Sequence, residues 1–206
     1  MDDIKLKYNT LCSIPCDINE HLPTLYSYAT KCESVLELGV RGCISSWAFS
    51  LGLLNNGSTS KKLIMNDISE CNIEEIMHKT KDTDLNIKYI WKNDLEIELE
   101  ESVDITFIDT WHIYGQLKRE LKKFAPLTNK YIIMHDTTVD EFEGETIREL
   151  GGIQTAIRQS EATGIPVVEI MKGLSYAIEE FLSENSNWVL EKKYTNNNGL
   201  TILRRV

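Results

Sequence analysis

The stretch ELGVRGCIS (Glu37 to Ser45) follows an apolar run and leads into a helical pattern. Gly39 and Gly42 would let a ligand come close to the backbone between these two elements. The start of the helix that follows offers free N–H groups and the positive end of the helix dipole. The stretch therefore predicts a strand, a ligand-binding turn and a helix in succession.

Short apolar runs alternate with helical patterns around this stretch. Apolar residues recur near helical spacing in Cys43 to Leu54, Ile73 to Lys81 and Tyr114 to Phe124. Runs that indicate buried strands are Ser34 to Gly39, Lys62 to Asp67, Ile87 to Trp91, Val103 to Asp109 and Tyr131 to Asp136. Strands and helices that alternate at this pace imply a parallel sheet wrapped by crossover helices, which is an α/β fold.

The end of the chain has a different pattern. Trp188 to Tyr194 and Leu200 to Val206 indicate strands, and Asn198-Gly199 between them is a strong hairpin signal because both residues tolerate positive φ. We therefore predict a Rossmann-like, doubly wound and mostly parallel sheet that ends in an antiparallel C-terminal hairpin. With 206 residues, 42% of them hydrophobic, the chain fits one domain over 1–206. Within it, 1–33 would be an N-terminal helical segment.

Composition excludes several classes of function. The net charge of −10 argues against a nucleic-acid partner, because binding to phosphates needs clustered Lys and Arg. The cysteines are five in number and lack tight pairs, which favours reduced thiols in a cytoplasmic protein. The N-terminus has no apolar signal region, and no stretch approaches the roughly 20 apolar residues of a membrane span. We expect a soluble intracellular protein that binds neither membrane nor nucleic acid.

Acidic residues stand at the tips of successive predicted strands. Asp67 ends the second strand and Asp94 follows the third, so both would lie at the sheet edge where α/β proteins bind ligands. An acid after the second strand typically holds ribose hydroxyls. The pattern permits a dinucleotide or S-adenosyl-L-methionine (SAM). Arg41 stands where the dinucleotide fingerprint has its second glycine, and the closing hairpin also fits SAM better.

A second group of polar residues ends two later strands, in FIDTWHIY (Phe107 to Tyr114) and IIMHD (Ile132 to Asp136). If these strands are neighbours, Asp109, His135 and Asp136 would converge at the same edge. Hard oxygen ligands suit Mg²⁺, whereas an imidazole among them favours Mn²⁺ or Fe²⁺. The sequence therefore predicts a divalent-metal site there, with turn or helix capping as the structural alternative for each acid.

Taken in order, ELGVRGCIS, the strand-tip Asp67, FIDTWHIY and IIMHDTT resemble the motifs of class I SAM-dependent methyltransferases. More narrowly, they are similar to metal-dependent sugar O-methyltransferases, related to the macrolide-glycoside and rhamnosyl methyltransferases, and to the cephalosporin-hydroxylase-like family. The similarity runs from Glu37 to Val206. The second glycine of the loop stands one place earlier than in the commoner pattern.

This resemblance implies a set of SAM-binding positions. They are Glu37, Gly39, Val40, Gly42, Ser45, Asp67, Ile68, Asp94 and Asp109. The glycine loop would shape the methionine end of the pocket, where Ser45 would contact the carboxylate. Asp67 would hold the ribose hydroxyls, Ile68 would lie beside the adenine, and Asp94 would lie near the adenine amine.

The resemblance also assigns the metal and the catalytic residues. The positions of Asp109 and Asp136 are metal ligands in those sugar methyltransferases, while the position of His135 usually carries an acid. His112, three residues beyond Asp109, would be the general base, and its ordinary pKa of roughly 6.5 suits that task. A divalent ion that chelates vicinal sugar hydroxyls would orient the acceptor and lower its pKa.

The acceptor side of the site is predicted from the residues around these motifs. Trp111 and Tyr114 offer flat faces for a sugar, or they pack the helix that follows. Thr137 and Thr138 begin the acidic stretch TTVDEFEGETIREL (Thr137 to Leu150), which resembles an acceptor loop, and 137–187 would hold that loop with its helices.

We therefore expect a SAM-dependent, metal-assisted O-methyltransferase that acts on a sugar hydroxyl, for example of a rhamnose-like deoxysugar in a glycan. The alternatives are a methyltransferase for a catechol-like small molecule, and a nucleotide- or dinucleotide-binding module without methyl transfer. A homo-oligomer, or an association with glycosyltransferases, is compatible with the first expectation.

Overall fold

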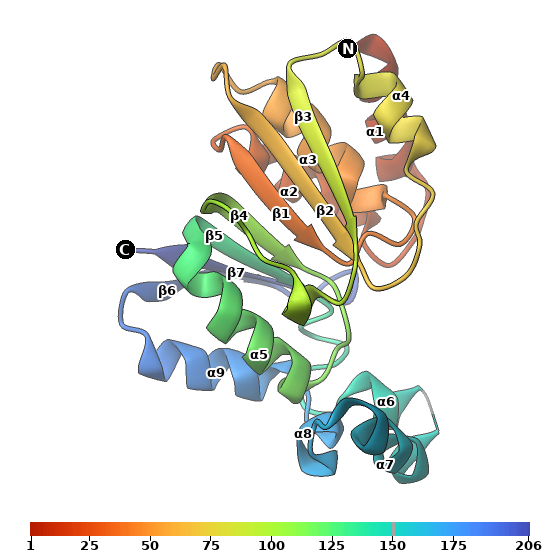
Figure 1. The fold of residues 1–206 in the computed structure, drawn as a ribbon, viewed down its shortest axis with the longest axis vertical. Coiled ribbons are helices and arrows are strands. Elements are labelled where there is room, and N and C mark those ends of the chain that lie inside the picture. Colours follow the sequence, from red (N-terminus) through yellow and green to blue (C-terminus); the bar gives the residue numbers. More distant parts are fainter. Residues whose placement is uncertain (150) are drawn as a thin grey trace.

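In the computed structural model, which describes residues 1–149 and 151–206, seven strands form one sheet in the order β3-β2-β1-β4-β5-β7-β6 (Figure 1). The strands are β1 (Ser34–Leu38), β2 (Lys61–Asp67), β3 (Leu85–Trp91), β4 (Val103–Ile108), β5 (Thr128–His135), β6 (Trp188–Tyr194) and β7 (Leu200–Arg205). Strands β1 to β5 pair in parallel, and β7 lies antiparallel between β5 and β6. The predicted fold class is thereby confirmed.

Helices cover both faces of this sheet. They are α1 (Asp2–Ser13), η1 (Asn19–His21), α2 (Leu22–Ala29), α3 (Ile44–Leu54), α4 (Glu74–Thr80), η2 (Asp94–Glu96), α5 (Tyr114–Phe124), η3 (Ala125–Leu127), α6 (Glu145–Arg148), α7 (Gly152–Thr163), α8 (Val167–Met171) and α9 (Leu174–Glu184). Figure 1 shows α1 to α4 on one side and α5 and α9 on the other.

Alternate residues of each central strand enter the two halves of the core. On β4, Ile105 and Phe107 pack with α1, α2 and α3, while Ile108 packs with α5 and α9. This alternation follows from the period of two in a strand, and it explains why the buried parallel strands read as continuous apolar runs.

The segment after β5 contains an additional group of helices. Ile113, Ala156, Ile165 and Ile170 form a small apolar cluster that holds α6, α7 and α8 together below the sheet (Figure 1). The predicted acceptor segment 137–187 therefore contains these helices and also α9. Leu150, the last residue of the stretch read as an acceptor loop, lies outside the described residues.

The C-terminal hairpin turn meets the N-terminal segment. Asn197, Asn198 and Gly199 have φ of 46°, 67° and 95°, the left-handed backbone that Asn-Gly predicted. The Asn197 side chain donates to the Cys16 carbonyl at 2.6 Å, and His21 Nε2 donates to the Asn196 carbonyl at 2.9 Å. These contacts place the N-terminal segment over the edge of the sheet where β1, β4 and β5 end.

Four predicted strands extend one residue beyond the observed ones, and three of these are parallel strands. Gly39 and Asp136 follow β1 and β5 with φ of 87° and 57°, which ends the extended backbone. Asp109, after β4, also leaves the strand and is placed against the glycine loop. In residues 1–149 and 151–206, no helix has the length and apolar character that crossing a membrane requires.

Candidate active site

The glycine loop after β1 lies against the tip of β4. A Cβ on Gly39 would stand 1.8 Å from the carbonyl oxygen of Asp109, so only glycine fits there, and its φ of 87° has the same requirement. Gly42 differs, because the nearest atom that its Cβ would meet is Cγ1 of Ile44 at 4.0 Å. Gly39 thus allows the loop after β1 to pack against the tip of β4, whereas Gly42 faces open space that a ligand can enter.

Glu37 and Ser45 are brought together by the loop. The fully buried Glu37 carboxylate accepts hydrogen bonds from Ser45 Oγ at 2.5 Å and Ser46 Oγ at 2.7 Å. Burial raises the pKa of Glu37 to about 8, although these two hydrogen bonds oppose the rise. The Ser45 hydroxyl is therefore engaged by Glu37, and its contact with a SAM carboxylate stays a prediction.

Helix α3 begins directly after Cys43, whose φ is 59°. Within the described residues, no side chain caps the start of α3. Its first N–H groups consequently remain available to an anionic ligand group.

Asp67 holds the same loop from the side of β2. Its Oδ2 accepts from the backbone N–H of Val40 at 2.9 Å and of Arg41 at 3.0 Å, and its Oδ1 accepts from Ser69 N–H at 2.8 Å. Burial opposes ionisation, yet these hydrogen bonds outweigh it and lower the pKa of Asp67. The carboxylate is ionised at neutral pH, and Oδ1 can accept one further hydrogen bond.

Beside Asp67, two large apolar side chains are exposed. Ile68 is 69% exposed and Trp91 is 60% exposed, and the Trp91 indole donates to the Ile68 carbonyl at 3.1 Å. Large apolar side chains such as these are usually buried in the core. Their exposure at the predicted adenine position leaves a flat apolar surface next to the ribose acid.

Asp94 faces the interior, toward helix α5. Both of its oxygens accept from Gln116 Nε2, at 3.1 and 3.2 Å, and Gln116 also donates to the buried Glu120. Burial, and then the charge of Asp94, raise the pKa of Glu120 well above its ordinary value. The sequence reading missed Gln116 and Glu120. The sequence does contain a signal for them, because Gln116 and Glu120 lie on the same helical stripe as the apolar Leu117 and Leu121.

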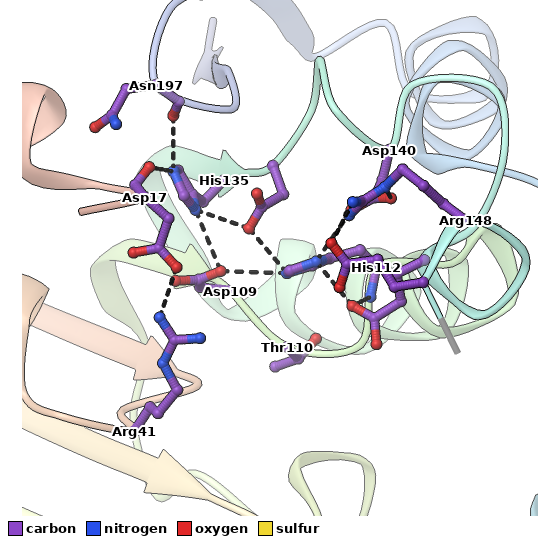
Figure 2. A network of polar contacts seen from close by, with 12 residues as sticks. Asp17, Arg41, Asp109, Thr110, His112, His135, Asp140, Arg148 and Asn197 are labelled. Atoms are coloured by element: carbon purple, nitrogen blue, oxygen red, sulfur yellow. Dashed lines mark hydrogen bonds and ion pairs between the residues drawn. The ribbon is translucent and has the colours of Figure 1, made fainter. Parts of the chain in front are cut away.

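The polar cluster predicted at the tips of β4 and β5 is present (Figure 2). Parallel pairing sets Ile108 beside Met134, so the residues that follow them lie next to each other. His112 Nε2 lies 3.2 Å from Asp109 Oδ1 and 3.2 Å from Asp136 Oδ2. His135 Nδ1 lies 3.4 and 2.9 Å from the same two oxygens. Carboxylate and imidazole atoms thus converge on one point at the sheet edge.

The orientation of the His135 ring is set by backbone carbonyls. Its Nε2 lies 3.1 Å from the Asp17 carbonyl and 3.2 Å from the Asn197 carbonyl. Since carbonyl oxygens only accept, this nitrogen carries the proton and Nδ1 is the nitrogen directed at the carboxylates. Burial alone would lower the pKa of His135, but Asp109 and Asp136 raise it to about 10.

The His112 ring is enclosed by acidic groups on both sides. Beyond Asp109 and Asp136, its Nδ1 lies 2.9 Å from Glu145 Oε2 and 3.3 Å from Asp140 Oδ2. Burial would lower the pKa of His112, yet hydrogen bonds with Asp109, Asp140 and Glu145 raise it well above its ordinary value. The sequence reading placed Asp140 and Glu145 in an acceptor loop and missed these contacts.

The cluster contains groups of atoms close enough to share a cation. One ligand atom each of Asp109, His112 and Asp136 lie within 4.8 Å of one another. His112 thus stands both where the base was predicted and among the possible ligands, while His135 reaches the same carboxylates from the other side. Burial opposes ionisation of Asp109, but hydrogen bonds from the two histidines hold its pKa well below the usual range.

Trp111 and Tyr114, which were predicted to contact the sugar, have different surroundings. Tyr114 donates to Glu180 at 2.5 Å, and the ammonium groups of Lys118 and Lys172 lie 5.2 and 5.5 Å from its ring centroid. Its ring therefore packs α5 against α9, the structural alternative that the sequence left open. Trp111 is half-buried and donates from its indole to Thr146 Oγ1 at 3.2 Å, which ties it to α6.

Thr137 and Thr138 lie under the C-terminal hairpin. Thr137 is buried and its hydroxyl accepts from Thr201 at 2.9 Å. The Gly199 backbone packs against Thr138, and a Cβ on Gly199 would stand 2.3 Å from the Thr138 hydroxyl. Both threonines thus fix the hairpin to the segment after β5, and their contact with an acceptor stays a prediction.

Comparisons with known proteins show what this fold is similar to. No protein-family model and no curated protein matches the sequence. Among solved structures, an O-methyltransferase from Bacillus cereus in complex with SAH superposes with a TM-score of 0.59 at 12% identity, over 100% of this chain and 90% of that one. The SAH-bound methyltransferase PaMTH1 from Podospora anserina gives 0.58 at 12%, over 100% and 88%.

A third similar structure is TomG from Streptomyces achromogenes, an O-methyltransferase involved in tomaymycin synthesis, in complex with SAM. It gives a TM-score of 0.58 at 10% identity, over 91% of this chain and 80% of that one. The chain therefore has the fold of SAM-dependent methyltransferases along nearly its whole length.

Proposed function

We propose that this protein is a SAM-dependent O-methyltransferase that uses a divalent cation and methylates a hydroxyl of a sugar, for example a deoxysugar in a glycan. One observation carries the proposal: Asp109 belongs to two sites at once. Its backbone carbonyl lies against Gly39 of the cofactor loop, and its carboxylate faces His112 and His135. A methyl donor on the loop and an acceptor at the cluster would therefore be neighbours, as direct transfer requires.

The residues at the loop fit SAM. The uncapped start of α3 suits the methionine carboxylate, and the open space at Gly42 admits a ligand close to the backbone. Asp67 has hydrogen-bonding capacity left for a ribose hydroxyl. Ile68 and Trp91 offer an exposed apolar surface for the adenine ring. The similarity of fold to SAM- and SAH-bound methyltransferases supports the same ligand.

The residues at the cluster fit a divalent cation. Asp109 and Asp136 supply carboxylate oxygens, and His135, whose Nε2–H is held by backbone carbonyls, directs Nδ1 at the same point as a possible nitrogen ligand. An imidazole among the donors favours Mn²⁺ or Fe²⁺ more than an all-oxygen set would. When bound, the cation would orient vicinal hydroxyls and lower the pKa of the one that reacts.

The chemistry left to the chain is proton transfer and positioning. His112 Nε2 faces the point where the carboxylates converge. These carboxylates raise the pKa of His112, and a cation bound between them would offset their charge. Nε2 can then take the proton of the acceptor hydroxyl while its oxygen gains the methyl group and the S–C bond of SAM breaks to release SAH. Asp109 then stabilises the imidazolium that forms. Trp111 and the helices after β5 border this point and would exclude water.

A neutral polyol acceptor suits the charge of the cluster. The carboxylates of Asp109, Asp136, Asp140 and Glu145 surround His112, so an acceptor that carries phosphate or carboxylate would be repelled. Sugar hydroxyls meet this condition, and the resemblance of the motifs to sugar methyltransferases favours them over a catechol. A glycan would also be a natural acceptor for a homo-oligomer or for a protein that works beside glycosyltransferases.

The test is transfer of labelled methyl from SAM to a panel of deoxysugars and catechols, followed by mass spectrometry, with Mg²⁺ or Mn²⁺ and with chelator. We expect a methylated sugar that requires the cation. Products formed equally well in chelator would contradict the metal, and transfer to catechols alone would contradict the sugar. Calorimetry with SAM and NAD tests the remaining alternative: NAD binding without SAM binding would replace the proposal with a dinucleotide-binding module.

A further inference from the structure

The Nδ1 side of His112 is held by residues that arrive from a different part of the chain. Asp140 lies in the loop after β5 and Glu145 begins helix α6, and their carboxylates lie 3.3 and 2.9 Å from Nδ1. Figure 2 shows Asp140 on the opposite side of the His112 ring from Asp109 and His135.

Asp140 is fixed from several directions. Its side chain has 0% exposure, and Arg148 binds both oxygens, Nε to Oδ1 at 2.7 Å and Nη2 to Oδ2 at 3.0 Å. Its backbone N–H donates to the Asp136 carbonyl at 3.1 Å, and its carbonyl accepts from Leu174 N–H at 2.8 Å. A bidentate arginine pair of this kind holds a carboxylate in one orientation.

Glu145 is joined to the backbone of His112 as well as to its ring. Its N–H donates to the His112 carbonyl at 3.0 Å, and its Oε2 accepts from the His112 N–H at 3.4 Å. Gly144 makes this approach possible, because a Cβ there would stand 2.4 Å from the Ile170 carbonyl oxygen.

These contacts suit orientation of the ring more than binding of a second cation. His112, Asp140 and Glu145 also lie close enough together to hold a metal ion, but the guanidinium of Arg148 already occupies both Asp140 oxygens. Its positive charge would repel a cation at that point. Ionised carboxylates only accept hydrogen bonds, so the partner they require on His112 is an Nδ1–H.

We infer that Asp140 and Glu145 are positioning residues, which keep a proton on His112 Nδ1 and aim Nε2 at the point between Asp109 and Asp136. Arg148 acts one step further away by fixing Asp140. The inference rests on the proposed function for the role of His112 as the base. It adds that the segment after β5, beyond bordering the acceptor, sets the tautomer of the base.

The test is nitrogen-15 NMR of the imidazole groups in the full chain loaded with Mg²⁺, with His112 assigned by loss of its signal in His112→Gln. In the unaltered protein we expect a slowly exchanging Nδ1–H signal from His112. In the double variant Asp140→Asn/Glu145→Gln we expect this signal to broaden or vanish. A His112 ring without a protected Nδ1–H, or one that behaves identically in the double variant, would overturn the inference.

Kinetics supply the second readout. At metal sites, loss of a partner that orients a histidine typically costs about 10- to 100-fold in activity or metal affinity. We expect kcat to fall by that factor in the double variant while KM for SAM is unchanged. Glu145→Gln alone, at a partly exposed position, serves if Asp140→Asn fails to fold, and Glu145→Asp should restore part of the rate. An unchanged kcat in a folded double variant would refute the role.

A matched control is Glu169→Gln, because Glu169 also pairs with an arginine, Arg119, at 2.7 Å but lies outside the cluster. It should leave the His112 signal and kcat unchanged. The two proposals fail separately: if no acceptor is methylated but the NMR result is as expected, the proposed function fails and the orientation of His112 stands.

Discussion

The two halves of the candidate site at the sheet edge satisfy their polar groups in different ways. At β1 and β2, each acidic side chain has partners within the protein: Glu37 accepts from Ser45 and Ser46, and Asp67 accepts from loop amides. At β4 and β5, the carboxylates of Asp109 and Asp136 each lie 2.9–3.4 Å from nitrogens of both His112 and His135. The carboxylates of Asp140 and Glu145 lie on the other side of the His112 ring.

This difference indicates how each half would recognise the ligand that is proposed for it. In the first half, the acidic side chains already have hydrogen-bond partners within the protein. A ligand there would be recognised by the shape of the loop, by backbone N–H groups and by exposed apolar surface. The second half concentrates negative charge that raises the pKa of both histidines. Protons on the histidines offset the repulsion between these carboxylates, and a bound cation would do the same. Substitutions should therefore affect folding in the first half and cation binding in the second.

The largest effect is expected for Gly39→Ala. Positive φ and the overlap of the new Cβ with the Asp109 carbonyl should together cost about 2–6 kcal/mol of unfolding free energy. Urea denaturation measures the loss. Gly42→Ala is the matched control: it should keep the stability of the unaltered protein while it weakens SAM binding in calorimetry. Equal stability of the two variants would remove the distinction between a glycine for the fold and a glycine for the ligand.

For the second half, Asp136→Asn should abolish most cation binding and leave the fold intact. Asparagine tolerates the φ of 57° at this position and keeps the shape of aspartate, but it lacks the charge. We expect Mn²⁺ affinity to fall on the order of 100-fold, about 2.7 kcal/mol. Calorimetry measures the affinity, and the melting temperature in chelator should stay close to that of the unaltered protein. Unchanged affinity would contradict Asp136 as a ligand.

A smaller effect, visible only as a pH dependence, is expected for Glu37→Gln. In the folded protein the pKa of Glu37 is raised from 4.5 to about 8, so the folded state holds a proton that the unfolded state releases between these values. Its contribution to stability is thus complete below about pH 4.5 and is lost as pH rises to about 8, with a slope of at most roughly 1.4 kcal/mol per pH unit.

The Glu37→Gln variant removes this pH dependence of stability. The histidines contribute a pH dependence of the same sign to the stability of both proteins, so it does not affect the comparison. Urea unfolding at several pH values should show the stability advantage of the unaltered protein decline toward pH 8. Parallel stability profiles of the two proteins would show that Glu37 does not carry its proton when folded.

Most of the fold could be predicted because its signals are local. Each predicted strand from Ser34 onward is observed within a few residues of its expected bounds, and the helix expected over Tyr114 to Phe124 has those bounds. Strand ends were less certain. Gly39 and Asp136 look like strand residues in the sequence, and their left-handed backbone depends on contacts with other segments.

The candidate site was predicted in part for the same reason. Acids at strand tips must share one sheet edge, which brought Asp109, His135 and Asp136 together. Partners from distant segments could not be read in this way. The carbonyls of Asp17 and Asn197 that orient His135 leave no trace in residue types, and Asp140 looks like any acid of a loop.

The alternation of strands and helices, the hairpin and the residues at the sheet edge follow from the sequence alone, because hydrophobic period and turn chemistry act between near neighbours. The contacts and protonation of those residues arise only in the folded chain. It engages Ser45 with Glu37, packs Tyr114 against α9 and directs opposite nitrogens of His112 and His135 at the same carboxylates. Hydrogen-bond partners and burial set these outcomes, and both arise where segments far apart in the chain meet.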